Sequence, residues 1–222
     1  MSRLLAASLT RQHLASDIVS LCAFFISLEA FVGSEMNAEA AAPRSLESTN
    51  GAKLNIIRVF NTTLRVWLYQ TSQSNVFTHE DIPDVTFKQK CIFNKMINIT
   101  DEMYHFYRKV NINGNKLTSH YLGQFDLTSQ PPISMSVPDL SAKNKSPFED
   151  MKLTYSKGGC SVFEIKLRDE AKNKGHTTER PDCEMYIKKK GGPIDPSDDC
   201  KSAYEKTCKT EIYVTYETSC GV

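Results

Sequence analysis

The cysteines constrain the fold of this chain more than any other feature. Five of the seven lie between residues 160 and 220. Residues 197–208 have a helical pattern in which Cys200, Tyr204 and Cys208 share one face, and that face would pack against the rest of the domain. The two helix cysteines are about 12 Å apart at 1.5 Å rise per residue, beyond the roughly 7 Å between Cα atoms that a disulfide spans. Each must therefore tie the helix to another part of the chain.

Short β-type runs occupy most of the remaining sequence. Residues 64–69 alternate in polarity, so that Arg65, Trp67 and Tyr69 share one face of the first predicted strand. Further β-branched and aromatic runs, bounded by Gly, Pro, Asp or Lys-rich breakers, lie at residues 90–99, 103–110, 116–124, 133–137, 151–155, 160–166 and 183–187. Residues 70–83 read as a polar loop, and a last strand is expected to end at Cys220.

About eight strands in sequential order, with one helix after them, predict an all-β fold. We expect an eight-stranded antiparallel up-and-down barrel, with a C-terminal α-helix packed on its outside. A two-sheet sandwich is the alternative that periodicity leaves open. A closed barrel of about eight strands has room for side chains and one small ligand.

The N-terminal segment has the order of a secretory signal. Arg3 and Arg11 precede an apolar run at residues 18–28, and small residues follow. A membrane anchor is the alternative, but the run is well short of the about 20 residues that a spanning helix needs. We expect residues 1–42 to be a signal peptide and processing region, and residues 43–222 to be one secreted domain that is free of the membrane.

Loss of this segment also removes Cys22 and leaves an even set of six cysteines, which predicts three disulfides in an exported protein. Six cysteines allow 15 pairings, and helix geometry removes only those that join Cys200 to Cys208. No paired ligands have zinc-type spacing, so we expect no metal. Sequons that agree with export predict glycosylation at Asn61, Asn98 and Asn144.

Composition argues against several classes of function. The formal net charge of +1 gives no basic surface of the kind that nucleic acid or an anionic membrane requires. His105 and His120 lie in strand patterns without a serine elbow or a metal-ligand partner at useful spacing. Ser161 beside Cys160 is not a nucleophile motif. We therefore expect no enzyme activity and no cofactor.

These runs, in this order, resemble the tick salivary lipocalins, also called the histamine-binding protein family. Residues 61–69 are similar to the family's first strand, residues 91–95 to its second and residues 183–186 to its last barrel strand. The helix and the terminal cysteine resemble its tail, so the resemblance covers nearly all of residues 43–222. It implies three disulfide pairs, namely Cys91 with Cys220, Cys183 with Cys208 and Cys160 with Cys200.

Family members that bind biogenic amines carry a motif of Cys-Asp-aliphatic, then Glu-Leu-Trp or Glu-Leu-Tyr, then Cys. Here Ser161 replaces the aspartate, whereas Glu184 and Tyr186 keep the glutamate and the aromatic residue. One of the two motif carboxylates is therefore missing.

A barrel that captures a protonated amine needs an inward carboxylate and aromatic rings, because a buried cation without a partner is unstable. Glu184 and Tyr186 face the same way on one strand, and Trp67 and Tyr69 do so on another. If both faces point inward, they form an acidic and aromatic wall. The alternative is that Trp67 is a core residue and Glu184 a carboxylate in solvent at a strand edge.

An anionic ligand would require a different set of residues in the barrel interior. A lipid carboxylate needs inward cations, and Arg65, Lys95 and Arg108 are available on predicted strands. Arg65 shares the face of Trp67, so we include it among the candidate ligand-binding residues.

We expect a monomeric secreted protein that sequesters a small host mediator. The resemblance to tick salivary lipocalins implies that this blunts host inflammation. A biogenic amine such as histamine or serotonin is the first candidate. A lipid mediator such as a leukotriene, a thromboxane or a fatty acid is the second. A third is a protein partner, a host complement or coagulation factor, bound through the charged segments 168–181 and 188–199.

Overall fold

The computed structural model describes residues 53–79, 81–168, 180–189 and 193–221. The predicted signal segment with Cys22 lies outside these residues, as does most of the charged segment 168–181. The described elements are α2 (Ile56–Phe60), β1 (Arg65–Thr71), β2 (Val76–His79), β3 (Ile82–Ile99), β4 (Met103–Ile112), β5 (Asn115–Phe125), β6 (Ser134–Pro138), β7 (Pro147–Lys157), β8 (Cys160–Leu167), β9 (Asp182–Lys189), α3 (Asp198–Thr207), β10 (Tyr213–Val214) and the 3₁₀ turn η2 (Thr218–Gly221).

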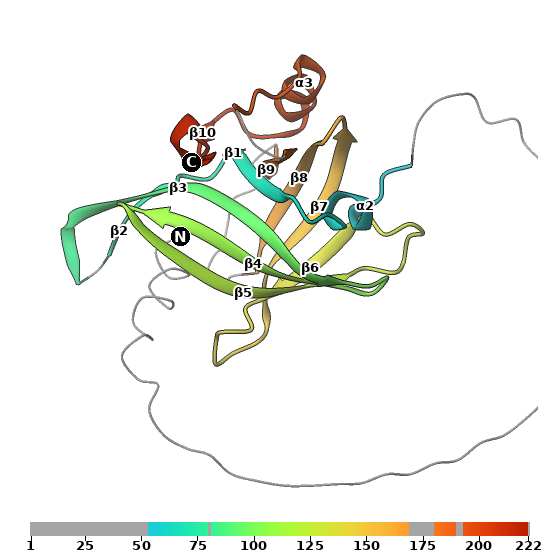
Figure 1. Ribbon diagram of the computed structural model, residues 1–222, viewed down its shortest axis with the longest axis horizontal. Helices are drawn as coiled ribbons and strands as arrows, with labels where there is room; N and C mark the ends of the chain where they lie inside the picture. Colours follow the sequence, from blue (N-terminus) through green and yellow to red (C-terminus); the bar gives the residue numbers. More distant parts are fainter. Residues whose placement is uncertain (1–52, 80, 169–179, 190–192, 222) are drawn as a thin grey trace, which may run out of the picture.

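Eight of the strands close into a barrel (Figure 1). Hydrogen-bonded neighbours follow the order β1, β9, β8, β7, β6, β5, β4 and β3, and all of these pairs are antiparallel. The ring closes because β1 pairs with β3 at Val66↔Asn94 and Trp67↔Phe93. The predicted up-and-down barrel with an external helix is therefore confirmed, and the two-sheet sandwich is excluded.

Alternation along the strands separates two hydrophobic clusters. The inner cluster lies inside the barrel and includes Phe106, Phe163 and Tyr186. The outer cluster includes Trp67 and Tyr204 and lies between the barrel wall and the C-terminal segment with α3. The helix thus covers an apolar patch on the outside of the barrel.

The three disulfides are those that the family resemblance implies. Cys91 joins Cys220, Cys160 joins Cys200 and Cys183 joins Cys208, with Cα–Cα distances of 5.1, 6.4 and 5.6 Å. Two of the bonds fix α3 to β8 and β9, and the third fixes the C-terminal turn to β3. None of the helices in the described part of the chain has the length and apolar composition needed to cross a membrane.

Three local predictions are wrong. The expected loop at residues 70–83 contains β2, which forms a hairpin with a β3 that begins at Ile82 rather than at residue 90. The expected last strand is only Tyr213–Val214, and Cys220 lies in a 3₁₀ turn. Helix α2 was not expected. Its five residues are too few to show a helical period in the sequence.

Helix α2 packs into the inner cluster at the end of the barrel away from the β2–β3 hairpin (Figure 1). The ring of Phe60 stacks on Tyr104 with centroids 4.7 Å apart and on Phe163 at 5.5 Å. Asn55 caps the helix, since its side chain accepts a hydrogen bond from the backbone nitrogen of Arg58 at 3.1 Å. Because Phe60 is fully buried, α2 acts as a plug.

Removal of the Asn55 cap should destabilise helix α2. We expect Asn55→Ala to lower the free energy of unfolding by about 1 kcal/mol, because one backbone donor at the start of α2 loses its acceptor. Urea unfolding followed by circular dichroism measures the change. Asn55→Ser is the matched control, since serine also caps helices, and it should lose less than half as much. Equal losses in the two variants would contradict the capping role.

Candidate functional site

A cavity of about 160 Å³ lies inside the barrel, beside the β1–β2 connection. The exposed Ser74 is among its lining residues, so the cavity reaches the surface at that end. Its apolar wall is formed by Leu68, Phe77, Ile92, Val110, Phe148 and Leu167. Its polar and charged wall includes Gln73, Asn75, Arg108, Tyr121, Glu149, Glu184 and Thr215.

A network of charged and polar side chains forms the charged part of this wall. Arg108 Nη2 lies 3.4 Å from Glu149 Oε1 as an ion pair and donates a hydrogen bond to Tyr186 Oη at 3.1 Å. Tyr186 Oη in turn donates to Glu184 Oε2 at 2.6 Å. Arg108 Nε donates to Asn94 Oδ1 at 3.2 Å. One guanidinium therefore serves two carboxylates, one directly and one through a phenol.

Strand parity explains why these charges face inward. Arg108 follows the buried Tyr104 and Phe106 at two-residue steps on β4. Glu149 precedes the buried Met151 and Leu153 in the same way on β7. Each charge thus continues the core-facing row of an otherwise apolar strand.

The register between β1 and β9 places the third charge. Tyr186 lies opposite Leu68 and Glu184 opposite Thr71, across a bulge in β1. Both Leu68 and Thr71 line the cavity. Side chains directly opposite each other point to the same face of a sheet, so Glu184 and Tyr186 are on the inner face.

Burial shapes the protonation of the network. Burial raises the pKa of Glu149 to about 7, against the opposing attraction of Arg108. Burial also raises the pKa of Tyr186 well above its usual value, so the phenol keeps its proton and can donate to Glu184. Burial works to lower the pKa of Arg108, but Tyr186, Glu149 and Glu184 outweigh it and raise this pKa, so the guanidinium stays charged.

The cavity is left with excess negative charge and with unused hydrogen-bonding atoms. When both carboxyls are ionised, Glu149 and Glu184 oppose the single cation Arg108 among the described lining residues. Glu149 Oε1, whose contact with Arg108 lacks hydrogen-bond geometry, and Gln73 Nε2 have no hydrogen-bond partner among the described residues. The first is an acceptor and the second a donor. This arrangement suits a small molecule that carries a cation and an acceptor group.

Two of the predicted ligand-binding residues lie inside the barrel and three lie outside. Glu184 lines the cavity, and Tyr186 donates a hydrogen bond to its carboxylate from inside the barrel. Trp67 and Tyr69 belong to the outer cluster. The expected shared wall of these four residues is therefore not formed. The physical reason is the register. Trp67 lies opposite Ile187 on β9, and these two positions face outward while Leu68 and Tyr186 face inward.

The three cations proposed for an anionic ligand also separate. Arg65 covers the rings of Trp67 at 5.6 Å and Phe93 at 4.9 Å on the outer surface. Lys95 is exposed and donates to the backbone oxygen of Thr63 at 2.5 Å. Only Arg108 lines the cavity among the three, and its charge is already shared by the internal carboxylates.

Glu149 is the charged residue of the site that the sequence analysis missed. It lies four and two residues before Leu153 and Met151, so a carboxylate in the apolar row of a strand was the available signal. The three sequon residues Asn61, Asn98 and Asn144 are exposed, and their glycosylation stays a prediction. Within the described residues, no group of three or more His, Cys, Asp or Glu side chains could hold a metal.

Comparison with family models and with curated proteins gives no match. No family model matches the chain, and no curated protein matches it. The barrel, the cavity and the charges inside it are therefore the basis for inferring a function.

Proposed function

We propose that this protein is a secreted lipocalin-type carrier that binds one small cationic molecule inside its barrel. A biogenic amine such as histamine or serotonin is the ligand class that the cavity suits best. The observation that carries the proposal is the pair of carboxylates, Glu149 and Glu184, set against one guanidinium in the cavity wall. The protein would act by sequestration without turnover, as the resemblance to tick salivary lipocalins also implies.

Charge balance favours a cation over an anion. A buried charge is stable only when it is paired, and an ammonium group next to Glu149 would complete the balance of the ionised network. A ligand carboxylate would add a third negative charge to a wall in which Arg108 already has Glu149 and Glu184 as partners. The lipid-mediator alternative therefore starts from an electrostatic disadvantage.

Cavity volume points the same way. A cavity of about 150 Å³ accommodates benzene, whereas drug-sized ligands occupy about 300–1,000 Å³. The 160 Å³ found here therefore suits a molecule built on one or two small rings. A lipid mediator with a long hydrocarbon chain is too large for it.

Titration calorimetry with histamine and serotonin tests the proposal. We expect micromolar or tighter binding at pH 8, and we expect Glu184→Gln to weaken it at least tenfold, equivalent to about 1.4 kcal/mol, because the wall loses a negative charge. Glu164→Gln is the matched control, since Glu164 also lies on a barrel strand but pairs with Lys152 away from the cavity. It should bind like the unmodified protein.

Two outcomes would contradict this function. If leukotriene or a fatty acid binds and neither amine does, the ligand is a lipid. If amine binding is weakened no more by Glu184→Gln than by Glu164→Gln, the carboxylate of Glu184 does not contribute to the site.

A further inference from the structure

The barrel wall is incomplete between β1 and β3. These strands pair at only two positions, Val66↔Asn94 and Trp67↔Phe93, and then separate toward the open end. The gap between them is occupied by the C-terminal strap, which we define as residues 213–220. Its first two residues, Tyr213 and Val214, pair with Thr71 and Gln70 of β1 as strand β10.

Strand β3 bends away from β1 where the strap enters. Cys91 has a φ of 53°, a left-handed conformation that is uncommon for a residue other than glycine. The register between β3 and β4 shifts between Lys90 and Phe93, which marks a bulge at Cys91 and Ile92. Ile92 lines the cavity and Cys91 bonds to Cys220. The bulge therefore makes room for the strap and supplies its covalent anchor.

Thr215 takes the place of a missing wall residue. Its backbone nitrogen donates to Tyr69 O at 2.9 Å, and its backbone oxygen accepts from Cys91 N at 2.8 Å. Its hydroxyl donates to Leu68 O at 2.5 Å. Thr215 is fully buried and lines the cavity. It therefore bridges β1 and β3 and closes the side of the cavity where the two strands do not meet.

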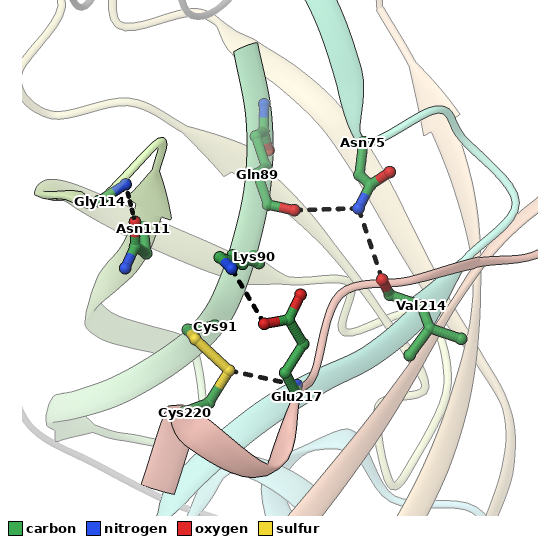
Figure 2. Close-up of polar contacts among 9 residues, drawn as sticks. All are labelled: Asn75, Gln89, Lys90, Cys91, Asn111, Gly114, Val214, Glu217 and Cys220. Atoms are coloured by element: carbon green, nitrogen blue, oxygen red, sulfur yellow. Dashed lines mark hydrogen bonds and ion pairs between the residues drawn. A yellow bond between two sulfur atoms is a disulfide. The ribbon is translucent and has the colours of Figure 1, made fainter. Parts of the chain in front are cut away.

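Figure 2 shows the contacts that hold the strap in this position. Lys90 Nζ pairs with Glu217 Oε2 at 3.0 Å, and Lys90 is next in sequence to Cys91 of the Cys91–Cys220 disulfide. Asn75 Nδ2 donates to Gln89 O at 3.0 Å and contacts Val214 O at 3.5 Å. These contacts join the strap to β3 and to the β1–β2 connection at the open end of the cavity.

We propose that the C-terminal strap is part of the binding site, with Thr215 as a positioning residue and the Cys91–Cys220 disulfide as the bond that keeps the cavity laterally closed. This inference rests on the proposed function, since it concerns retention of the same ligand. The other two disulfides anchor α3, which contributes no residue to the cavity wall, whereas Cys91–Cys220 anchors the strap, which contributes Thr215. Ligand retention should therefore depend on one disulfide and not on all three.

A comparison of two disulfide variants tests the proposal. Cys91→Ser with Cys220→Ser should raise the dissociation rate of histamine at least tenfold, measured from NMR line shapes. Cys160→Ser with Cys200→Ser, which frees the helix and leaves the strap anchored, should change it less than threefold. Equal rates in the two variants would overturn the proposal.

Trp67 reports the position of the strap without any ligand. It is the single tryptophan of the chain, and the strap residue Tyr216 packs on its ring with centroids 5.3 Å apart. We expect stronger acrylamide quenching of its fluorescence in the Cys91→Ser, Cys220→Ser variant. Thr215→Leu, which keeps the anchor but enlarges the wall residue, should weaken histamine binding at least threefold while quenching stays unchanged. Unchanged binding in Thr215→Leu would also overturn the proposal.

Failure of the proposed function has a different signature. If the unmodified protein binds neither amine, phenol serves as a neutral probe of one ring, and the same comparison of variants is made with its NMR line shapes. Faster phenol release in the Cys91→Ser, Cys220→Ser variant would support the strap inference although the amine proposal had failed. Absence of phenol binding would overturn both.

Discussion

Replacement of Arg108 by Met is expected to lower the free energy of unfolding by about 3–5 kcal/mol at pH 8, the usual loss when one partner of a buried ion pair is removed. Glu149 and Glu184 are only 4% and 8% exposed. Arg108 is the single cation among the described residues that line their cavity. Met fills much of the same length but carries no charge, so the loss would be electrostatic more than steric.

The pH dependence distinguishes this electrostatic loss from a packing defect. Arg108 is the charge that holds the pKa of Glu149 down against burial, so in Arg108→Met that pKa should rise further. A carboxyl whose folded pKa exceeds its unfolded value binds more protons in the folded state, and stability then falls as pH rises between the two values. Urea unfolding should therefore show a larger loss at pH 8 than at pH 5, with Glu149 alone contributing about 1 kcal/mol of the difference.

Two controls accompany Arg108→Met. Arg168→Met removes a cation that pairs with Asp150 on the outside of the barrel at 2.6 Å, and we expect it to cost less than about 1 kcal/mol. Addition of Glu149→Gln and Glu184→Gln to Arg108→Met removes the uncompensated charges and should recover most of the loss. A loss that is the same at pH 5 and pH 8, and is not recovered, would mean that the network contributes packing alone.

The barrel could be predicted because its signals are local. Alternation and breakers predict all eight barrel strands, although β3 begins eight residues before its predicted start, and the Cys200–Tyr204–Cys208 face predicts the external helix. Disulfide pairing is a long-range property, and its assignment came from the family resemblance rather than from spacing. The plug α2 was missed, and the strap was predicted as one strand although only Tyr213–Val214 is β structure, because both segments are too short to have a period of their own.

The site was harder to predict because parity does not say which face is inside. Trp67 and Tyr69 share a face as expected, but which face points inward is fixed by the pairing of β1 with β9, which puts Leu68 beside Tyr186. On β4 and β7 the neighbouring apolar residues do indicate which face points into the barrel. Arg108 follows Phe106, and Glu149 precedes Met151, each in the buried row. A charge in an apolar row is thus a better guide to this cavity than an exposed-looking aromatic pair.

Serotonin affinity is expected to fall about 30-fold between pH 8 and pH 5.5. Proton linkage gives this factor when one group with a pKa of about 7, here Glu149, must be ionised in the complex. A bound ammonium favours the Glu149 carboxylate, so below pH 7 binding must displace a proton, and the affinity falls as pH falls. Serotonin suits the test because an alkylamine and a phenol both titrate near pH 10. No histidine lines the cavity among the described residues.

Calorimetry at several pH values, in buffers with different heats of ionisation, measures both the affinity and the protons released on binding. The unmodified protein should release close to one proton per serotonin at pH 6 and almost none at pH 8.5. Glu149→Gln should bind more weakly at pH 8, with an affinity that is nearly flat over this range and no proton release. If Glu149→Gln keeps the pH dependence of the unmodified protein, the titrating group lies elsewhere, and Glu149 is not the carboxylate that meets the amine.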